Sequence, residues 1–395
     1  MRVAAAQPIA SSDQQATVGE VLDRRLRRDH ARPVAVALSG GGDSLALLLM
    51  ADAWAKGAGR ELLVLTVDHR LRPASADWTA ACATTAARLG PAFQALSWDG
   101  PKPATGLPAA ARDARHRLLA EAAREAGARV ILMGHTADDV REAARMRETG
   151  STTPGPRDWS PSPAWPHGRG LFLLRPLLGV ARRDIRDWLT ARGETWIDDP
   201  ANADLAYARP RARRDLAGRP GEAPAQADLP ADLARACQAD DAGVIALARA
   251  ALRAAAPDLA RRFVASACLC AGGSARPPAR ARVERLSARL VGDDGFVSSL
   301  AGARITADAT RVRFAREPGE AARGGLRALR LAAGETGVWD GRFEVSSDGA
   351  LEVRCGRRGA PTAVGDAGEP VEVRAMFLGL ERLLAACGVV DREPS

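Results

Sequence analysis

The chain has 395 residues, of which 46% are hydrophobic and 26% are charged, and its formal net charge is +8. This length is enough to bury a sizeable core and predicts two or three domains, and we expect no membrane association because no apolar run is long enough to cross a bilayer. The positive charge fits a polyanionic partner, although almost all of the cations are arginine, as a GC-rich genome alone would produce.

The N-terminus and the cysteines predict a cytoplasmic protein. The first residues lack the basic segment and the long apolar core of a secretion signal. The six cysteines are scattered, without a Cys-x-x-Cys pair. Such usage is typical of reduced thiols in a reducing compartment, rather than of zinc or iron–sulfur ligands.

The most informative stretch is a glycine-rich turn at residues 39–44, with the sequence Ser-Gly-Gly-Gly-Asp-Ser. The apolar run at 33–38 predicts a short buried strand before it, and a second run predicts a helix over 44–58. Glycines at such a junction let backbone N–H groups approach a ligand closely, and the helix N-terminus carries a partial positive charge. The stretch therefore predicts an anion site, with phosphate as the expected anion.

Asp43 distinguishes this turn from two common phosphate-binding turns. No Gly-Lys-Ser/Thr follows the glycines, as it would in a Walker loop, and the spaced third glycine of the dinucleotide fingerprint is missing. A carboxylate repels phosphates unless a divalent cation lies between them, so Asp43 indicates Mg²⁺. The alternative is an ordinary glycine-rich turn in which Asp43 or Ser44 caps the helix.

Strands and helices are expected to alternate as far as about residue 200. The sequence predicts strands at 33–38, 62–67, 92–98, 130–134 and 171–174, and helices at 44–58, 73–89, 107–127, 138–147 and 182–192. Strands that are apolar on both faces and separated by helices predict an α/β fold, a parallel doubly wound sheet covered on both sides. In such sheets ligands bind beyond the carboxyl ends of the strands.

The segment 149–170 interrupts this alternation with five prolines and two tryptophans, Trp159 and Trp165. We expect a long loop without secondary structure of its own, which is either a functional lid or a mobile insertion. The tryptophans either stack on nucleic-acid bases or pin the loop to the core.

The remainder of the chain predicts a helical subdomain and then a small β-rich tail. Residues 210–230 are rich in Arg, Pro, Ala and Gly and predict a linker, 231–256 and 280–290 predict helices, and short strands are expected at 311–314, 342–345, 351–354 and 371–374. The expected division is therefore a catalytic domain over 1–215, a helical subdomain over 216–310 and a β-rich region over 311–395.

Polar residues follow the predicted strands at two further points. Asp68 and His69 come after one strand, and His135, Asp138 and Asp139 come after another. Because the carboxyl ends of parallel strands meet at one edge of a sheet, we expect these groups to converge on the glycine turn. Taken singly, paired aspartates are more often a helix start, and a lone histidine is more often structural.

These motifs together resemble the tRNA(Ile)-lysidine synthetase family of the PP-loop ATP pyrophosphatases, over roughly residues 33–214. The matching stretches are Ser-Gly-Gly-Gly-Asp-Ser at 39–44, Val-Asp-His-Arg-Leu-Arg at 67–72, the Arg112 and Arg115 helix, Gly-His-Thr-Ala-Asp-Asp-Val-Arg-Glu-Ala at 134–143, Arg-Pro-Leu at 175–177, and Asp-Pro-Ala-Asn at 199–202 followed by Tyr207, Arg209, Arg211 and Arg213. The chain departs from the family pattern at Arg70, Val140, Ala143 and Pro210, and in its long 149–170 segment.

The resemblance implies a ligase that forms a C–N bond. ATP adenylates the C2 oxygen of the wobble cytidine in the CAU anticodon of tRNA-Ile, and the ε-amine of free L-lysine then displaces AMP to give lysidine. The implied cofactors are ATP and Mg²⁺, with Asp43 as the metal ligand. The implied nucleotide-binding residues are Ser39, Gly40, Gly41, Gly42, Asp43, Ser44, Asp68 and His69, and the implied catalytic residues are Asp43, Arg112, Arg115, His135, Asp138 and Asp139.

Some of the implied roles stay open between residues. Arg112 and Arg115 lie three apart on one helical face and clamp either the α-phosphate or the target base. Asp138 or Asp139 binds the lysine ammonium or a second metal, and a carboxylate or His135 accepts the proton that lysine loses. The arginines at 209–214 and the later domains are expected to hold the tRNA backbone.

Two other functions are open at this point. One is a PP-loop tRNA-modifying enzyme of the thiolation type, against which the missing cysteine pairs argue. The other is a catalytically inactive tRNA-binding protein. Release of pyrophosphate in the presence of tRNA-Ile and lysine separates an enzyme from an inactive binder.

Overall fold

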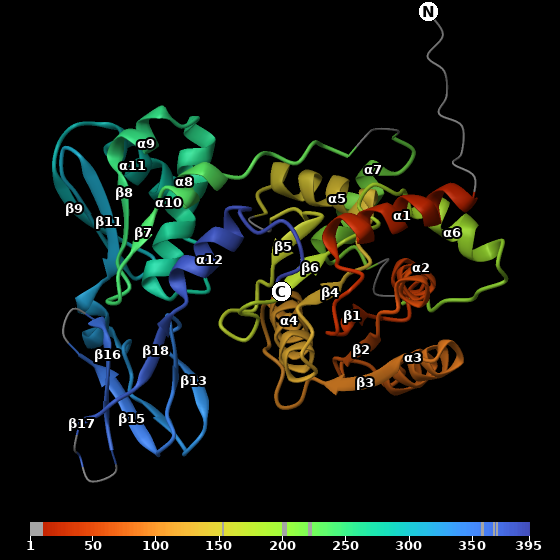
Figure 1. Ribbon diagram of the computed structural model, residues 1–395. Coiled ribbons are helices and arrows are strands. Elements are labelled where there is room, and N and C mark those ends of the chain that lie inside the picture. The colour runs from red at the N-terminus through yellow and green to blue at the C-terminus, as the bar shows by residue number, and fades with distance from the viewer. Residues whose placement is uncertain are drawn as a thin grey trace, which may run out of the picture. The chain divides into compact units, whose positions relative to one another are not determined.

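The computed structural model describes residues 11–151, 154–199, 204–219, 223–356, 359–365, 368 and 370–395, and Figure 1 shows their helices and strands. The chain forms two compact units. Unit 1 consists of Met1–Gln226 with Asp391–Ser395, and unit 2 is Ala227–Val390. Among the described residues, no helix combines the length and the apolar character that crossing a membrane requires.

Unit 1 is built on a six-stranded sheet with the strand order β3-β2-β1-β4-β6-β5. The strands are β1 Val34–Ala37, β2 Leu62–Asp68, β3 Ala92–Ser97, β4 Val130–Leu132, β5 Trp159–Pro161 and β6 Phe172–Leu174. All neighbours pair in parallel except β5, which is antiparallel to β6. The order reverses at β1, which lies between β2 and β4, and such a reversal is where open α/β sheets bind their ligands.

Helices surround this sheet, as the alternating pattern predicts. They are α1 Ser11–Arg25, α2 Gly42–Ala58, α3 Ser75–Leu89, α4 Leu107–Glu125, α5 Ala137–Glu148, α6 Arg182–Thr190 and α7 Ala208–Leu216. On one face, Leu119 and Ala123 of α4 pack in one cluster with Ala35 of β1 and Ile131 of β4. Every residue of β4 is buried, so the predicted parallel doubly wound α/β sheet is confirmed.

The prediction for 149–170 is wrong in one respect, because this segment contains strand β5. Trp159 pairs in register with Leu174 of β6, is buried, and stacks on Phe172 with 4.7 Å between ring centroids. The prolines of this segment argue against a strand, but β5 is an edge strand, where proline is tolerated. Trp159 therefore holds the segment to the sheet. The predicted linker at 210–230 is likewise wrong at its start, since α7 continues to Leu216.

The last residues of the chain belong to unit 1. Glu393 is buried and forms a two-point ion pair with Arg60, with Arg60 Nη2 2.9 Å from Glu393 Oε1 and Arg60 Nη1 3.0 Å from Oε2. The backbone N–H of Glu393 donates to the carbonyl of Arg25 (2.8 Å) at the end of α1. A buried two-point ion pair, in which only Arg60 Nε lacks a hydrogen-bond partner, therefore ties the chain end to the sheet domain.

Unit 2 begins with helices and a five-stranded antiparallel sheet of order β7-β8-β11-β10-β9. Its elements are α8 Ala231–Arg235, β7 Gln238–Ala239, β8 Ile245–Ala248, α9 Arg249–Ala254, α10 Pro257–Gly272, α11 Arg280–Val291, β9 Phe296–Leu300, β10 Ala303–Ala307 and β11 Arg311–Arg316. The single helix predicted over 231–256 is wrong. Asp240 accepts hydrogen bonds from the backbone of Ala242 and Val244, and Gly243 has a φ of 76°, so the chain turns into a hairpin there.

The β-rich tail that the sequence predicts is confirmed. Two antiparallel sheets have the orders β12-β15-β16-β17 and β13-β14-β18. Their strands, with the helix that follows, are β12 Leu329–Leu331, β13 Thr336–Trp339, β14 Phe343–Ser346, β15 Leu351–Cys355, β16 Pro361–Val364, β17 Pro370–Val371, β18 Arg374–Phe377 and α12 Gly379–Ala386. The division at 215/216 and 310/311 stays a prediction.

Candidate active site

A cavity of about 680 Å³ opens in unit 1 beyond the carboxyl ends of β1, β2 and β4. Its wall includes the glycine turn and Asp43, the pair Asp68 and His69, and His135 with Asp139. The three motifs that the sequence places after three strands therefore line one cavity. Arg115, Arg182, Arg186, Tyr207, Arg209 and Arg213 add positive and aromatic groups to the wall.

Two serines and a close neighbour shape the glycine turn. Ser44 Oγ donates to the carbonyl of Gly41 (2.8 Å) and accepts from the backbone N–H of Ser39 (3.2 Å). Gly40 has a φ of 83°, and a Cβ there would lie 2.5 Å from Cδ1 of Ile197. The backbone N–H of Ile197 also donates to the carbonyl of Gly40 (3.0 Å). Glycine is thus required for the turn and for its packing. The Ser44 amide donates to the carbonyl of Gly41 (3.1 Å), while the amides of Gly42 and Asp43 at the start of α2 keep no intrahelical acceptor and remain available to an anion.

Gly134 brings the end of β4 against this turn. A Cβ at Gly134 would lie 3.0 Å from the carbonyl carbon and oxygen of Asp43 and 3.0 Å from Cα of Ser44. Only glycine allows such a close approach of two backbones without displacement. This contact positions His135 and α5 next to Asp43.

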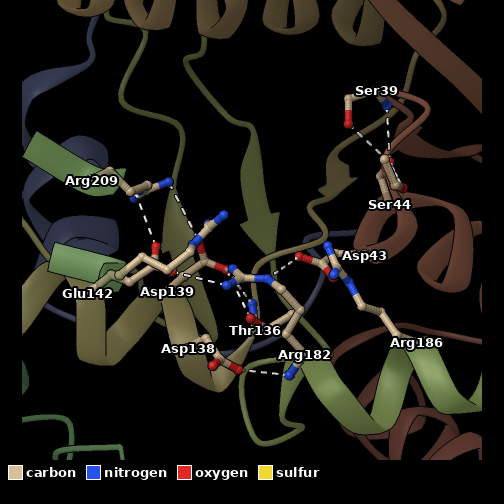
Figure 2. A network of polar contacts seen from close by, with 12 residues as sticks. Ser39, Asp43, Ser44, Thr136, Asp138, Asp139, Glu142, Arg182, Arg186 and Arg209 are labelled. Carbon is tan, nitrogen blue, oxygen red and sulfur yellow. Dashed lines mark hydrogen bonds and ion pairs between the residues drawn. The ribbon is translucent and has the colours of Figure 1, made fainter. Parts of the chain in front are cut away.

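Three carboxylates share one arginine near the glycine turn, as Figure 2 shows, and two of them, Asp43 and Asp139, line the cavity. We call Asp43, Asp139 and Glu142 the acidic cluster. Arg182 donates from Nε to Asp43 Oδ2 (3.0 Å), from Nη2 to Asp139 Oδ2 (3.2 Å) and from Nη1 to Glu142 Oε1 (3.0 Å). Neither Arg182 nor Glu142 was among the site residues predicted from the sequence.

Two further arginines contact the acidic cluster. Arg213 Nε donates to Glu142 Oε1 (2.8 Å). Arg209 lies 3.5 Å from Asp139 Oδ1 and 3.7 Å from Glu142 Oε2. The three carboxylates of the acidic cluster thus face three guanidinium groups, and the formal charges of the two sets cancel.

The surroundings shift the two aspartates of this cluster in opposite directions. Burial raises the pKa of Asp43, and Arg182 opposes that rise only in part. Burial acts in the same sense on Asp139, but His135, Arg182 and Arg209 overcome it and leave the pKa of Asp139 lowered. Asp139 also closes a capping box at the start of α5, where Asp139 Oδ2 accepts from the backbone N–H of Thr136 (2.9 Å).

Asp138 has a different neighbour from Asp139. Its Oδ2 accepts a hydrogen bond from the backbone N–H of Arg182 (2.7 Å), the first residue of α6. This contact fixes the backbone from which the Arg182 side chain extends.

The basic side of the site lacks such pairing; here Arg115 lines the cavity and Arg112 does not. Arg112 and Arg115 lie one turn apart on α4, and neither forms an ion pair with any residue in the described part of the chain. The Nε atom of Arg115 is buried without a hydrogen-bond partner. Burial, with Arg112 and Arg209 nearby, lowers the pKa of Arg115 to about 10. Arg115 as a whole is half-buried, and a cation that is partly removed from water without a partner is costly, so this wall is suited to an anion.

The histidines near this wall are neutral at physiological pH. Burial lowers the pKa of His135 to about 3 and that of His116 to about 2. Burial, followed by Arg115, also lowers the pKa of His69, and the His69 ring meets Trp98 edge to face at 5.9 Å. Neutral imidazole nitrogens add no positive charge and can accept hydrogen bonds.

Arg175 and Asp68 serve as local supports. Arg175 Nη1 donates to the carbonyl of Arg157 (2.7 Å) and to Ser160 Oγ (3.0 Å), which holds the segment that carries β5. Asp68 Oδ1 accepts from the backbone N–H of Arg70 (2.7 Å) while Asp68 lines the cavity. Of the stretch at 199–202, residues 200–202 lie outside the described residues.

The structure accommodates three of the residues that depart from the family pattern. Val140 and Ala143 are buried on the inner side of α5, so their apolar side chains add to the core. Pro210 lies in the first turn of α7, where the missing N–H has no intrahelical acceptor.

The donor set fits a divalent cation held together with phosphate. Within the described ranges, no group of three His, Cys, Asp or Glu side chains is arranged to hold a metal. Mg²⁺ however needs only one or two carboxylates when phosphates supply the rest, and Asp43 stands at the glycine turn with a cationic guanidinium already 3.0 Å from its carboxylate. Burial raises the pKa of the one thiol near the turn, Cys82, which does not favour thiolate chemistry.

Residues 12–219 match the family of PP-loop domains. The chain is 52% identical over 328 residues to tRNA(Ile)-lysidine synthase of Caulobacter vibrioides, covering 83% of this chain and 77% of the relative. It is 38% identical over 346 residues to the protein of that name from Rhizobium meliloti (80% and 74% covered). It is 34% identical over 336 residues to that from Hyphomonas neptunium (81% and 89% covered).

Proposed function

The chain belongs to the tRNA(Ile)-lysidine synthase family of PP-loop proteins, and from this premise we propose how its cavity carries out the reaction. The enzyme is an ATP-using ligase that makes lysidine on tRNA-Ile. The further proposal is that adenylation of the RNA uses the basic side of the cavity and that free L-lysine binds at the acidic cluster.

In the first step, the C2 oxygen of the wobble cytidine in the CAU anticodon bonds to the α-phosphorus of ATP, and pyrophosphate leaves. The amides at the start of α2 face the departing phosphates, where preorganised N–H donors stabilise developing charge. Mg²⁺ would be held by Asp43 and would supply neutralising charge for the leaving group. Asp68 and His69 line the same end of the cavity.

The observation that carries this proposal is the unpaired Arg115 in the wall of the cavity that also contains the glycine turn and Asp43. A phosphate gives this guanidinium, and Arg112 beside it, the anion that the protein does not supply. We assign the pair to the α-phosphate of ATP or of the adenylated cytidine.

In the second step, the lysine ε-nitrogen bonds to C2, and the C2–O bond breaks to release AMP. Asp139 and Glu142 are buried and suit a cationic amine. The amine must lose a proton before it attacks. His135 is uncharged at neutral pH, because burial lowers its pKa to about 3. One of its ring nitrogens can therefore accept a hydrogen bond from that amine, with a carboxylate of the cluster as the alternative acceptor.

The tRNA body is proposed to contact the helical region after residue 215. Helix α11 exposes Arg282, Arg285 and Arg289 on one face, within about 60° of arc at 3.6 residues per turn. Arginines on the unit 1 side, such as Arg209 and Arg213, already contact carboxylates. We place the enzyme in the cytoplasm, with tRNA-Ile as its macromolecular partner.

Mass analysis of the wobble nucleoside tests this function directly. After incubation of CAU-anticodon tRNA-Ile with ATP, Mg²⁺, lysine and the enzyme, the cytidine mass is expected to increase by one lysine less one water. Asp43→Asn is expected to lower turnover by about 10³-fold, with tRNA affinity almost unchanged because the tRNA body binds elsewhere. Unchanged turnover of Asp43→Asn would remove the proposed role of Asp43, and an unmodified cytidine with the wild-type enzyme would contradict the function itself.

A further inference from the structure

Arg182 spans the two parts of the site that the proposed reaction uses in turn. Its guanidinium contacts Asp43, at the nucleotide end, and also Asp139 and Glu142, where the amine is proposed to bind. The side chain is only 14% exposed. We propose that Arg182 is an internal cation that couples nucleotide binding to lysine binding, an inference that rests on the proposed function.

The charge of the acidic cluster shows why exchange is necessary. Its three carboxylates are matched in charge by three guanidinium groups, and Glu142 Oε2 alone among their oxygens is buried without a hydrogen-bond partner, so an incoming ammonium finds an open acceptor but no net negative charge. Inserting it without moving an arginine leaves an excess buried cation, which is strongly unfavourable. A substrate cation therefore enters by replacing one arginine at the carboxylates.

Arg182 is the arginine best placed to be replaced. Arg209 and Arg213 contact Asp139 and Glu142 but are 36% and 38% exposed, and no contact joins either of them to Asp43 among the described residues. In the part of the chain that the structure describes, only Arg182 thus contacts carboxylates at both ends of the site.

The backbone of Arg182 is fixed while its side chain can move. Its N–H donates to Asp138 (2.7 Å), and the carbonyl of Val180 accepts from the N–H of Ala137 (3.0 Å). These two bonds hold the start of α6 to the start of α5. The exchange therefore consists of a rotation of one side chain rather than a movement of the helix.

The direction of the coupling follows from the charges. With ATP bound, its phosphates would lie at the glycine turn and Asp43 would hold the divalent cation, so Arg182 would lose one acidic partner and gain an anionic neighbour. As the guanidinium turns toward the phosphates, Asp139 and Glu142 each lose one partner and attract the lysine ammonium more strongly. Coupling between two sites of this kind is typically 5- to 150-fold in affinity.

Calorimetric titration of lysine, in the absence of tRNA, measures the coupling as a binding constant rather than as activity. With the wild-type enzyme, lysine is expected to bind at least about 5-fold more tightly when Mg²⁺ and a non-hydrolysable ATP analogue are present. Arg182→Met is expected to bind lysine with similar affinity with and without the analogue, and more tightly than the wild type without it.

The control variant is Arg183→Met, which changes the next residue of the same helix. Arg183 is 89% exposed and lies 3.8 Å from Asp187, so this variant should keep the full nucleotide effect. Arg182→Lys retains the charge for the case in which Arg182→Met does not fold. A single ammonium cannot bridge three carboxylates, so its nucleotide effect should be smaller than that of the wild type.

Equal lysine affinity of the wild type in the two states would overturn the coupling while leaving the proposed function standing. A full nucleotide effect in Arg182→Met, or in Arg182→Lys, would overturn the role of Arg182. If the wild type bound lysine in neither state, the lysine site of the proposed function would fail first, and the coupling would fail with it.

Discussion

The two sides of the cavity are built on opposite electrostatic principles. On the acidic side, the carboxylates of Asp43, Asp139 and Glu142 all contact arginines. On the basic side, Arg112 and Arg115 have no acidic partner among the described residues, and Arg115 Nε is buried without any partner. The carboxylates are thus matched in charge by arginines, although Glu142 Oε2 has no hydrogen-bond partner, whereas Arg112 and Arg115 have no acidic partner within the described ranges.

This difference separates stability from function. A paired buried charge is destabilised when its partner is removed, because the remaining charge is left uncompensated. A half-buried charge without an acidic partner, such as Arg115, already carries part of that cost, so its removal should stabilise the fold while it harms binding. We therefore expect removal of a paired charge to lower the free energy of unfolding and removal of an unpaired charge to raise it, although the two kinds of charge look alike in the sequence.

The largest effect is expected at the buried pair of Arg60 and Glu393. Glu393→Gln removes the carboxylate that compensates Arg60, and both side chains are fully buried. We expect the free energy of unfolding to fall by about 3 kcal/mol, at the lower end of the range for a broken buried pair. Urea unfolding followed by circular dichroism measures this change. A change below about 1 kcal/mol would show that Glu393 does not compensate the buried charge of Arg60.

Arg115→Met is expected to give the reverse pattern. Turnover should fall by about 100-fold, as when one donor to a transition-state anion is lost, while the free energy of unfolding should rise by about 1 kcal/mol. The two values come from pyrophosphate release and from urea unfolding of the same preparation. Arg117→Met is a matched control, because Arg117 lies on the same helix and contacts Glu121 at its exposed surface (3.1 Å). A destabilised Arg115→Met would mean that Arg115 has a partner in solution.

The smallest effect, at most about 1.4 kcal/mol over the single pH unit tested, concerns the neutral histidines beside Arg115. Burial lowers the pKa of His116 to about 2 and that of His135 to about 3, whereas both titrate near 6.5 when unfolded. Between pH 6.5 and about 3 the unfolded chain binds more protons, so stability falls as the pH falls, by up to about 1.4 kcal/mol per histidine for each pH unit. His116→Gln should flatten the fall between pH 6 and 5, and an unchanged slope would contradict the neutral, buried state.

The sequence predicted the elements of unit 1 well because its strands are apolar on both faces and its turns contain glycine. It also predicted that Asp43, His135 and Asp139 line one cavity, since parallel strands end at a common edge. Arg182 was not predicted as a site residue because it lies 139 residues from Asp43 in the sequence, and no local pattern indicates such a contact. Glu142 had a usable signal, since it follows Asp139 by three residues on one helical face.

Unit 2 was predicted less well, and the reason is compositional. The alanine-rich stretch at 231–256 has high helix propensity, which outweighed the turn that Asp240 and Gly243 form. Tertiary pairing of β8 with β11 then overrides local preference. The edge strand β5 was missed for the related reason that its pairing with β6 is not visible in its own residues.

The measurement that tests the central claim most directly is pyrophosphate release by the wild-type enzyme with one substrate left out at a time. If the basic side serves adenylation of the RNA and the acidic side serves the later attack of lysine, ATP with tRNA-Ile alone should release pyrophosphate in a burst without lysine. Release that required lysine but not tRNA would mean that the amino acid is adenylated instead, and would contradict the assignment of the two sides.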